Sequence, residues 1–248
     1  MENALVILCG GDSSRMGSDK ALLPFGNCCM VEYLVHKFEP YFSKIYLSVK
    51  QKGIYSHLHL NVQEISDIYL NAGPLAGVFS TLSMIDEERA FYISIDTPFF
   101  DPKLAAHLLE MSASYDICTI QRKEDETEQI LSTVYSKSCI TKLGKCLLLR
   151  QYSIKNVQDK CKTLYVPQED LDFLPPLDVQ FFELDTRASY YQALQYLHDL
   201  EGDAIFRETS ELSNYSLNPD NALIPASSLL NSNFPRQGNP RSDDNKQS

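Results

Sequence analysis

The chain has 248 residues, enough for one large domain, and its hydrophobic fraction of 44% with a charged fraction of 22% is typical of a protein that buries a core. The formal net charge is −11, from 22 basic and 33 acidic residues. This balance disfavours nonspecific binding to nucleic acid or to an anionic membrane surface, because both need positive charge to displace counterions. A small polyanion still fits, provided that a few cations converge on it.

The cysteine pattern indicates free thiols rather than a disulfide framework or a zinc site. The seven cysteines stand at positions 9, 28, 29, 118, 139, 146 and 161, an odd count without a C-x-x-C pair. Such thiols are typical of a reducing compartment. The opening of the chain has no signal-peptide pattern, and no stretch approaches the ~20 apolar residues that a membrane span needs. The sequence therefore predicts a cytoplasmic protein.

The first half of the chain alternates short β-branched or aromatic runs with amphipathic segments of helical length. We predict strands at Ala4–Cys9, Lys44–Val49, Leu60–Gln63, Ala90–Ile95 and Tyr115–Ile120. We predict helices at Met30–Phe38, Leu75–Ile85 and Pro102–Met111. Strands that alternate with helices form right-handed βαβ units. The pattern therefore predicts an α/β fold, with a mostly parallel sheet and helices on both faces.

The second half of the chain is less regular and ends in a segment of different character. We predict strands at Gln129–Tyr135 and Phe181–Leu184 and helices at Ser138–Arg150, Ser153–Lys160 and Arg187–Leu200. Asp185-Thr186 supplies an N-cap for the last of these helices. Residues 208–248 are crowded with Ser, Asn and Pro, a composition that cannot bury enough apolar surface to offset chain entropy. We expect one folded domain over residues 1–207 and a disordered tail over 208–248.

A glycine-rich loop, LCGGDSSRMGSDKALLPFG, follows the first predicted strand. Gly10 and Gly11 let consecutive N–H groups point at an anion without a Cβ in the way. Arg15 offers a planar fork of donors and Lys20 a compact point charge, a combination that suits a triphosphate. The loop matches neither the Walker pattern nor the dinucleotide-binding pattern G-x-G-x-x-G. A surface loop with solvated charges is the alternative interpretation.

Two further segments lie where parallel strands expose their carboxyl ends, which is where ligands bind in such sheets. Asp96 comes directly after a strong strand and before Thr97-Pro98. A carboxylate there suits Mg²⁺, which takes one or two protein carboxylates together with substrate phosphates. The segment NAGPLAGVFS allows close backbone approach through Gly73 and Gly77 and leads into a helix. Each segment is also compatible with an ordinary turn.

Together these three segments resemble the molybdenum cofactor guanylyltransferases of the MobA type. The family signature LAGG-x-S-x-R-M-G-x-D-K-x-L-L is matched by residues 8–23 with a Cys in place of its Ala. GPLAG recurs at Gly73–Gly77, D-x-P at Asp96–Pro98, and a strand followed by N-T-P as Asp185-Thr186-Arg187. The resemblance covers about residues 3–200. It implies a Rossmann-like three-layer α/β/α sandwich of the nucleotide-diphospho-sugar transferase type.

The resemblance also implies a site. The nucleotide-binding positions of the family fall on Leu8, Cys9, Gly10, Gly11, Lys20, Asp67 and Asp96, with Glu64 as the alternative to Asp67 because the loop length differs. The catalytic positions fall on Arg15, Lys20 and Asp96, and Asp96 is also the position of the Mg²⁺ ligand. The chain departs from the family at Ser48, where the family has Asn, and at Gln129-Ile130-Leu131, where the family has H/Q-P-L.

The implied reaction is transfer of GMP from GTP to the terminal phosphate of molybdopterin, with or without molybdenum, and release of pyrophosphate. The resemblance also implies transient contact with other proteins of molybdenum cofactor assembly. One alternative is a nucleotidyltransferase of the same fold that uses CTP or a sugar phosphate. Another is a non-catalytic binding or adaptor protein in cofactor assembly. Retention of Arg15, Lys20 and Asp96 argues against the adaptor, because a binding protein has less need of a metal carboxylate.

Overall fold

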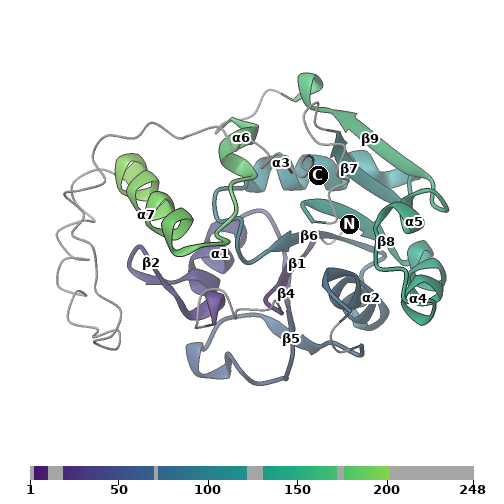
Figure 1. Ribbon diagram of the computed structural model, residues 1–248, viewed down its shortest axis with the longest axis horizontal. Helices are drawn as coiled ribbons and strands as arrows, with labels where there is room; N and C mark the ends of the chain where they lie inside the picture. The colour runs from purple at the N-terminus through teal and green to yellow at the C-terminus, as the bar shows by residue number, and fades with distance from the viewer. Residues whose placement is uncertain (1–2, 11–18, 70–71, 122–130, 172–175, 202–248) are drawn as a thin grey trace, which may run out of the picture. The chain divides into compact units, whose positions relative to one another are not determined.

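The structure, a computed structural model, describes residues 3–10, 19–69, 72–121, 131–171 and 176–201 (Figure 1). All of them belong to a unit that spans Met1–Thr209. The predicted tail, residues 208–248, lies outside the described residues, so its disorder stays a prediction. None of the described helices is long and apolar enough to cross a bilayer.

Seven strands form the main sheet, in the spatial order β5-β4-β1-β6-β8-β7-β9. In chain order they are β1 (Ala4–Leu8), β4 (Lys44–Val49), β5 (Gln63–Ser66), β6 (Arg89–Ser94), β7 (Ile117–Gln121), β8 (Thr133–Ser136) and β9 (Thr163–Pro167). Only β8 runs antiparallel to its neighbours in this sheet. β1 lies centrally, with Leu8 paired to Ser48 of β4 and to Ser94 of β6. A separate two-stranded hairpin joins β2 (Pro24–Phe25) to β3 (Cys28–Cys29).

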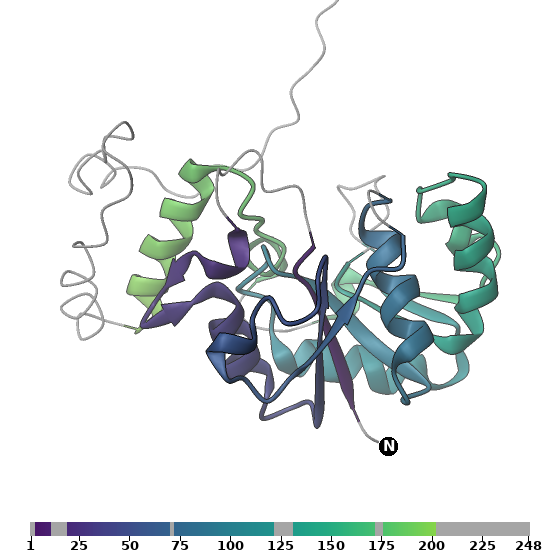
Figure 2. The ribbon, with the colours of Figure 1, turned by 90° about the horizontal axis from the view of Figure 1, so that it is seen from below.

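Helices cover both faces of the sheet, as the alternating pattern predicts (Figure 2). The helices are α1 (Met30–Phe38), α2 (Pro74–Met84), α3 (Pro102–Met111), α4 (Ile140–Leu148), α5 (Lys155–Gln158), α6 (Leu177–Gln180) and α7 (Arg187–Glu201). Side chains of β1 alternate between two buried clusters, with Leu5 and Ile7 packed among α1, α3 and α7, and Val6 among α2, α4 and α5. The fold is thus the predicted Rossmann-like three-layer α/β/α sandwich.

Local chemistry explains where the helices begin. Pro74 and Pro102 each stand at the start of a helix, where the missing N–H costs nothing. The Asp101 carboxylate accepts a hydrogen bond from the backbone N–H of Lys103 at 2.8 Å. Thr186 Oγ1 accepts one from the N–H of Ser189 at 3.0 Å, which confirms the predicted cap of the last helix. α7 lies beside the β2–β3 hairpin (Figure 2).

Three sequence-based predictions of secondary structure need correction. The strand expected at Leu60–Gln63 is β5, Gln63–Ser66, because Ile65 is the residue that turns into the core. Phe181–Leu184 is not a strand: it follows the short α6, and its aromatic rings pack on Phe99 and Phe100. The helix expected at Ser153–Lys160 is one turn, α5. β9 and the small hairpin were not predicted at all.

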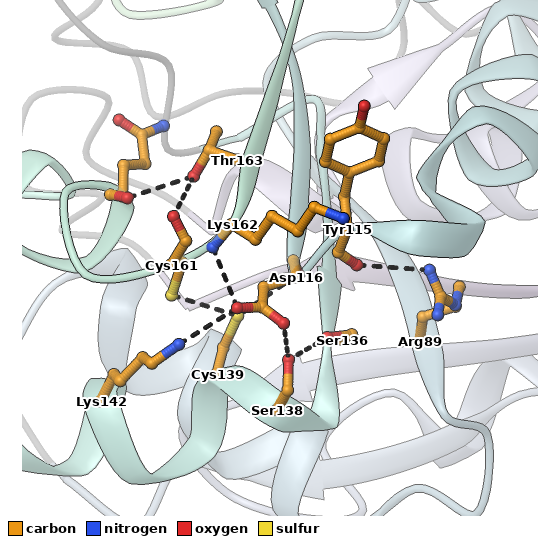
Figure 3. A network of polar contacts seen from close by, with 11 residues as sticks. Arg89, Tyr115, Asp116, Ser136, Ser138, Cys139, Lys142, Cys161, Lys162 and Thr163 are labelled. Carbon is orange, nitrogen blue, oxygen red and sulfur yellow. Dashed lines mark hydrogen bonds and ion pairs between the residues drawn. The ribbon is translucent and has the colours of Figure 1, made fainter.

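A network of hydrogen bonds joins the amino ends of β7 and β9 to the start of α4 (Figure 3). Asp116, directly before β7, accepts hydrogen bonds from Ser138 Oγ, from the Lys142 ammonium at 3.1 Å and from the Lys162 backbone N–H at 3.0 Å. Burial alone would raise the pKa of Asp116, but these donors lower it to about 2. The carboxylate therefore stabilises the folded chain wherever it is ionised.

We predict that Asp116→Asn lowers the free energy of unfolding by about 2 kcal/mol at pH 7. Because the folded-state pKa is depressed, the contribution is complete above the unfolded value near 3.8 and is lost as the pH falls through about 2. The difference from wild type should therefore shrink by roughly half at pH 3. Urea unfolding at both pH values measures it, with exposed Asp159→Asn as the control. A difference independent of pH would contradict this account.

Candidate functional site

The candidate site lies where β1, β4, β5 and β6 present their carboxyl ends. Main-chain hydrogen bonds continue beyond the strands there, from Cys9 N–H to the Ser48 carbonyl at 3.0 Å and from Asp67 N–H to the Val49 carbonyl at 3.0 Å. Ile95 N–H likewise donates to the Leu8 carbonyl at 3.2 Å. These bonds fix the backbone on which the predicted residues sit. Sequence segments far apart in the chain thus meet at one edge of the sheet.

Backbone and side chains approach one another closely on one side of this edge. Ser48 Oγ donates to Asp67 Oδ1 at 2.7 Å. A Cβ on Gly10 would lie 3.2 Å from Asp67 Oδ2, so a side chain there would crowd the carboxylate. A Cβ on Gly77 would lie 2.7 Å from both Leu8 Cδ2 and Ser48 Oγ. Close approach therefore explains Gly10 and Gly77. At Gly73, where close approach was also expected, a Cβ would meet nothing within 4 Å, and the positive φ of 67° explains the glycine instead.

The structure distinguishes Asp67 from Glu64, the two acids that the sequence offered for contact with the nucleoside. The Asp67 carboxylate faces Gly10 and Ser48. Burial raises the pKa of this carboxyl, although the Ser48 hydrogen bond and the Lys50 charge both act to lower it. Glu64 turns instead to the loop after β4, where its carboxylate accepts from the backbone N–H groups of Ile54 and Tyr55, both at 3.0 Å. Asp67 is therefore the acid at the candidate site, and Glu64 has a structural role.

Lys20 lies between two carboxylates on the other side of the same edge. Its ammonium is 3.1 Å from Asp96 Oδ2 and 3.3 Å from Asp185 Oδ1. The side chains of Lys20 and Asp96 are only 17% and 19% exposed, whereas Asp185 is 51% exposed. Paired charges this close to the protein interior interact more strongly than at an open surface. The pairing joins three segments that are up to 165 residues apart.

Asp185 is the residue that sequence reasoning missed at this site: the sequence indicated a helix cap and a match to the N-T-P motif, but no role beside Lys20. Its position follows from a backbone contact: Leu184 N–H donates to the Asp96 carbonyl at 2.9 Å. This contact lays the segment before α7 alongside the end of β6. The signal in the sequence was the match to the family's N-T-P motif, in which Asp185 takes the place of the Asn.

Asp19 and Tyr55 hold the segment that carries Lys20. Asp19 Oδ1 accepts from the backbone N–H of Ala21 at 3.0 Å, which starts the short 3₁₀ helix Lys20–Leu22. The hydroxyl of buried Tyr55 donates to Asp19 Oδ2 at 2.9 Å. Burial, and next the carboxylate of Asp19, raise the pKa of the nearby Cys9 thiol, so that it stays neutral beside the acids.

The structure thus places six of the predicted residues around one strand edge: Leu8, Cys9, Gly10, Lys20, Asp67 and Asp96. Gly11 and Arg15 lie outside the described residues, as do Gln129 and Ile130 of the motif expected on the acceptor side. The roles predicted for these four residues stay predictions.

The donor set at Lys20 fits a divalent cation. The carboxylates of Asp96 and Asp185 converge on the single ammonium of Lys20. A divalent cation in the position of that ammonium would be attracted to the two carboxylates more strongly, because it carries twice the charge. Mg²⁺ and Mn²⁺ prefer such oxygen ligands, and Mg²⁺ binds through one or two carboxylates plus substrate phosphates. Among the described residues, no group of three or more His, Cys, Asp or Glu side chains is placed to hold a metal ion. The two carboxylates at Lys20 match the number that Mg²⁺ takes when substrate phosphates supply further ligands.

Comparison with known proteins gives consistent results. A family model described as "MobA-like NTP transferase domain" matches residues 5–164. A probable molybdenum cofactor guanylyltransferase of Pelotomaculum thermopropionicum is 30% identical over 190 residues, which cover 76% of this chain and 90% of that protein.

Solved structures share the fold. Molybdopterin-guanine dinucleotide biosynthesis protein A of Archaeoglobus fulgidus superposes with a TM-score of 0.69 at 20% identity, covering 79% of this chain and 99% of that one. The Rv0371c protein of Mycobacterium tuberculosis, in complex with manganese, gives a TM-score of 0.54 at 15% identity, covering 78% and 98%.

We predict that Gly77→Ala lowers the free energy of unfolding by about 1–3 kcal/mol, because the new methyl group overpacks Leu8 and Ser48. Gly144→Ala is the matched control. Gly144→Ala also adds a methyl group to a helix, but the new Cβ would meet only the Phe79 ring, at 3.2 Å. Alanine also has a higher helix propensity than glycine, which favours the control variant. Urea unfolding should leave the control within about 1 kcal/mol of wild type. Equal free energies of unfolding for the two variants would refute the close approach of Gly77 to Leu8 and Ser48.

Proposed function

Because the chain belongs to the MobA-like NTP transferase family, we propose that it transfers GMP from GTP to the terminal phosphate of molybdopterin. Pyrophosphate is released, and the guanine dinucleotide form of the molybdenum cofactor results. The observation that carries the proposal is the convergence of Lys20, Asp96 and Asp185 at the carboxyl ends of parallel strands, the same edge of the sheet that carries Gly10 and Asp67. The name of the Pelotomaculum thermopropionicum relative supports the same activity.

The residues of the chain act mainly by binding and orienting the phosphates. Asp96 and Asp185 would hold Mg²⁺, which when bound neutralises charge on the triphosphate. Lys20, drawn away from the two carboxylates, donates to phosphate oxygens and stabilises the charge that develops on the leaving pyrophosphate. Arg15 assists from the same loop. Tyr55 and Asp19 keep the Lys20 segment in place while this exchange occurs.

The reaction needs no general base from the protein. An oxygen of the acceptor's terminal phosphate attacks the α-phosphorus of GTP in line, and the bond from that phosphorus to the β-phosphate oxygen breaks. A phosphate dianion is already a nucleophile near neutral pH. The contribution of the site is therefore to align the two reactants and to screen their mutual repulsion.

The nucleoside lies against Leu8, Cys9 and Gly10 in this proposal, with Asp67 as its acidic contact. Asp67 Oδ1 accepts from Ser48, and Oδ2 faces the Gly10 backbone, so the carboxylate is held in one orientation to accept from nucleoside donors. Ser48 replaces the Asn of the family, which makes base selectivity the point to test, with CTP as the competitor. The free-thiol composition supports a cytoplasmic reaction, with transient contact to other proteins of cofactor assembly.

Release of pyrophosphate tests the proposal directly. The full-length protein is incubated with each of GTP, CTP, ATP and UTP, with and without molybdopterin, and in Mg²⁺, Mn²⁺ or chelator. We expect release with GTP that depends on both acceptor and divalent metal. Preference for CTP would show that the nucleotide donor is CTP and not the proposed GTP. No release under any condition would overturn the enzymatic proposal in favour of an adaptor.

We predict that Lys20→Ala and Asp96→Ala each cost on the order of 3 kcal/mol of transition-state stabilisation, so that kcat/KM falls by roughly 10²–10³-fold. Asp185→Ala should also reduce kcat/KM, because Asp185 would help Asp96 to hold the metal ion. Exposed Lys103→Ala and Asp159→Ala are the matched controls and should turn over like wild type. Turnover within tenfold of wild type for Lys20→Ala or Asp96→Ala would remove that residue from the mechanism.

A further inference from the structure

Two thiols face each other at the end of the sheet opposite the candidate functional site (Figure 3). Cys139 ends the short 3₁₀ turn before α4, and Cys161 stands two residues before β9. Their sulfurs are 3.7 Å apart. Cys139 is buried, whereas Cys161 is half-buried. The proposed transfer reaction uses neither residue.

The polar network around this pair makes the two thiols unequal. The contact with the Cys139 thiol lowers the pKa of the Cys161 thiol, and the Lys142 ammonium lowers it further, against the effect of burial. The same contact, together with burial, raises the pKa of Cys139. Cys161 is thus the thiol that ionises first, and Cys139 is the thiol that stays neutral beside it. This is the arrangement of an attacking and a resolving thiol.

We propose that Cys139 and Cys161 form a redox-active dithiol that exchanges with low-molecular-weight disulfides such as glutathione disulfide and closes reversibly to an intramolecular disulfide bond. The Cys161 thiolate attacks one sulfur of the small disulfide, and the first small thiol leaves. Cys139 then loses its proton and attacks Cys161 Sγ, and the second small thiol leaves. The two protein thiols are oxidised, the small disulfide is reduced, and both protons end on the two released thiols.

The geometry allows closure with a local change. A disulfide bond is about 2.05 Å long, so the sulfurs have to approach each other by roughly 1.7 Å. Cys139 Sγ also donates to the Asp116 carbonyl at 3.3 Å, and that contact is exchanged for the new bond. The bond would tie the start of α4 to the start of β9 and enclose α4 and α5. It forms at the amino ends of the strands and leaves the carboxyl ends unobstructed.

Other cysteines lack this combination of features. Cys118 is buried in the sheet, and burial raises its pKa to about 12. Burial likewise raises the pKa of Cys29 to about 12. Cys146 is buried in α4. Oxidation at low concentrations of disulfide should therefore be selective for the pair.

Thiol counting in glutathione buffers tests the proposal. The full-length reduced protein is equilibrated at increasing ratios of oxidised to reduced glutathione, quenched with acid, and alkylated after unfolding. We expect loss of two of the seven alkylatable thiols as the ratio rises, and recovery of both with dithiothreitol. Tryptic digestion should then link the peptide of residues 138–142 to that of residues 161–162.

Single variants identify the order of attack. Cys139→Ser should retain one glutathionyl group on Cys161, because the resolving thiol is gone, whereas Cys161→Ser should lose the fast reaction. Cys28→Ser, a half-buried cysteine on the hairpin, is the matched control and should still close the bond. Absence of the linked peptide at every ratio in the wild-type protein would overturn the proposal, and this readout needs no variant to fold. Closure in Cys161→Ser would overturn it as well.

Discussion

The structure of the site depends on one charge arrangement, an ammonium held by two carboxylates from distant segments. Lys20 contacts Asp96 and Asp185 while its own side chain is mostly shielded from water. Removal of Lys20 leaves the carboxylate of Asp96 without its partner in a place where water compensates poorly, whereas removal of either carboxylate leaves Lys20 paired with the other. The cluster carries one positive and two negative charges, which leaves an excess that a divalent cation can satisfy. In the proposed reaction the same three side chains form a second set of contacts, in which the carboxylates face the metal ion and Lys20 faces phosphate.

The parallel sheet makes this arrangement possible because it brings the ends of β1, β4, β5 and β6 to one edge. On the Asp67 side of this edge Gly10 and Gly77 have no side chains, so that backbone, Ser48 and Asp67 come into contact. The Lys20 side depends on its charged side chains. The amino ends of β7 and β9 carry a different polar network, centred on Asp116, that joins strand to helix (Figure 3). The carboxyl ends of the strands therefore carry the candidate site, and the amino ends carry a separate network that joins strands to α4.

The sequence was informative where signals are local. Hydrophobic periodicity located β1, β4, β6 and α1 to within a residue or two, and the glycine, GPLAG and D-x-P motifs located most of the site. Other features depend on contacts that no local pattern encodes. Phe181–Leu184 has the composition of a strand, but its aromatic rings pack on Phe99 and Phe100 instead. Asp185 is brought to Lys20 by the segment whose Leu184 hydrogen-bonds to Asp96. The hydrogen bond of Tyr55 to Asp19 likewise spans 36 residues.

A crystal structure with a non-hydrolysable GTP analogue and Mg²⁺ would test the central claim most directly. The account predicts that the metal lies on Asp96, that the Lys20 ammonium has moved onto a phosphate oxygen, and that the base lies on the Leu8 and Asp67 side of the edge. A complex in which the nucleotide binds elsewhere while Lys20 still contacts both Asp96 and Asp185 would contradict the account.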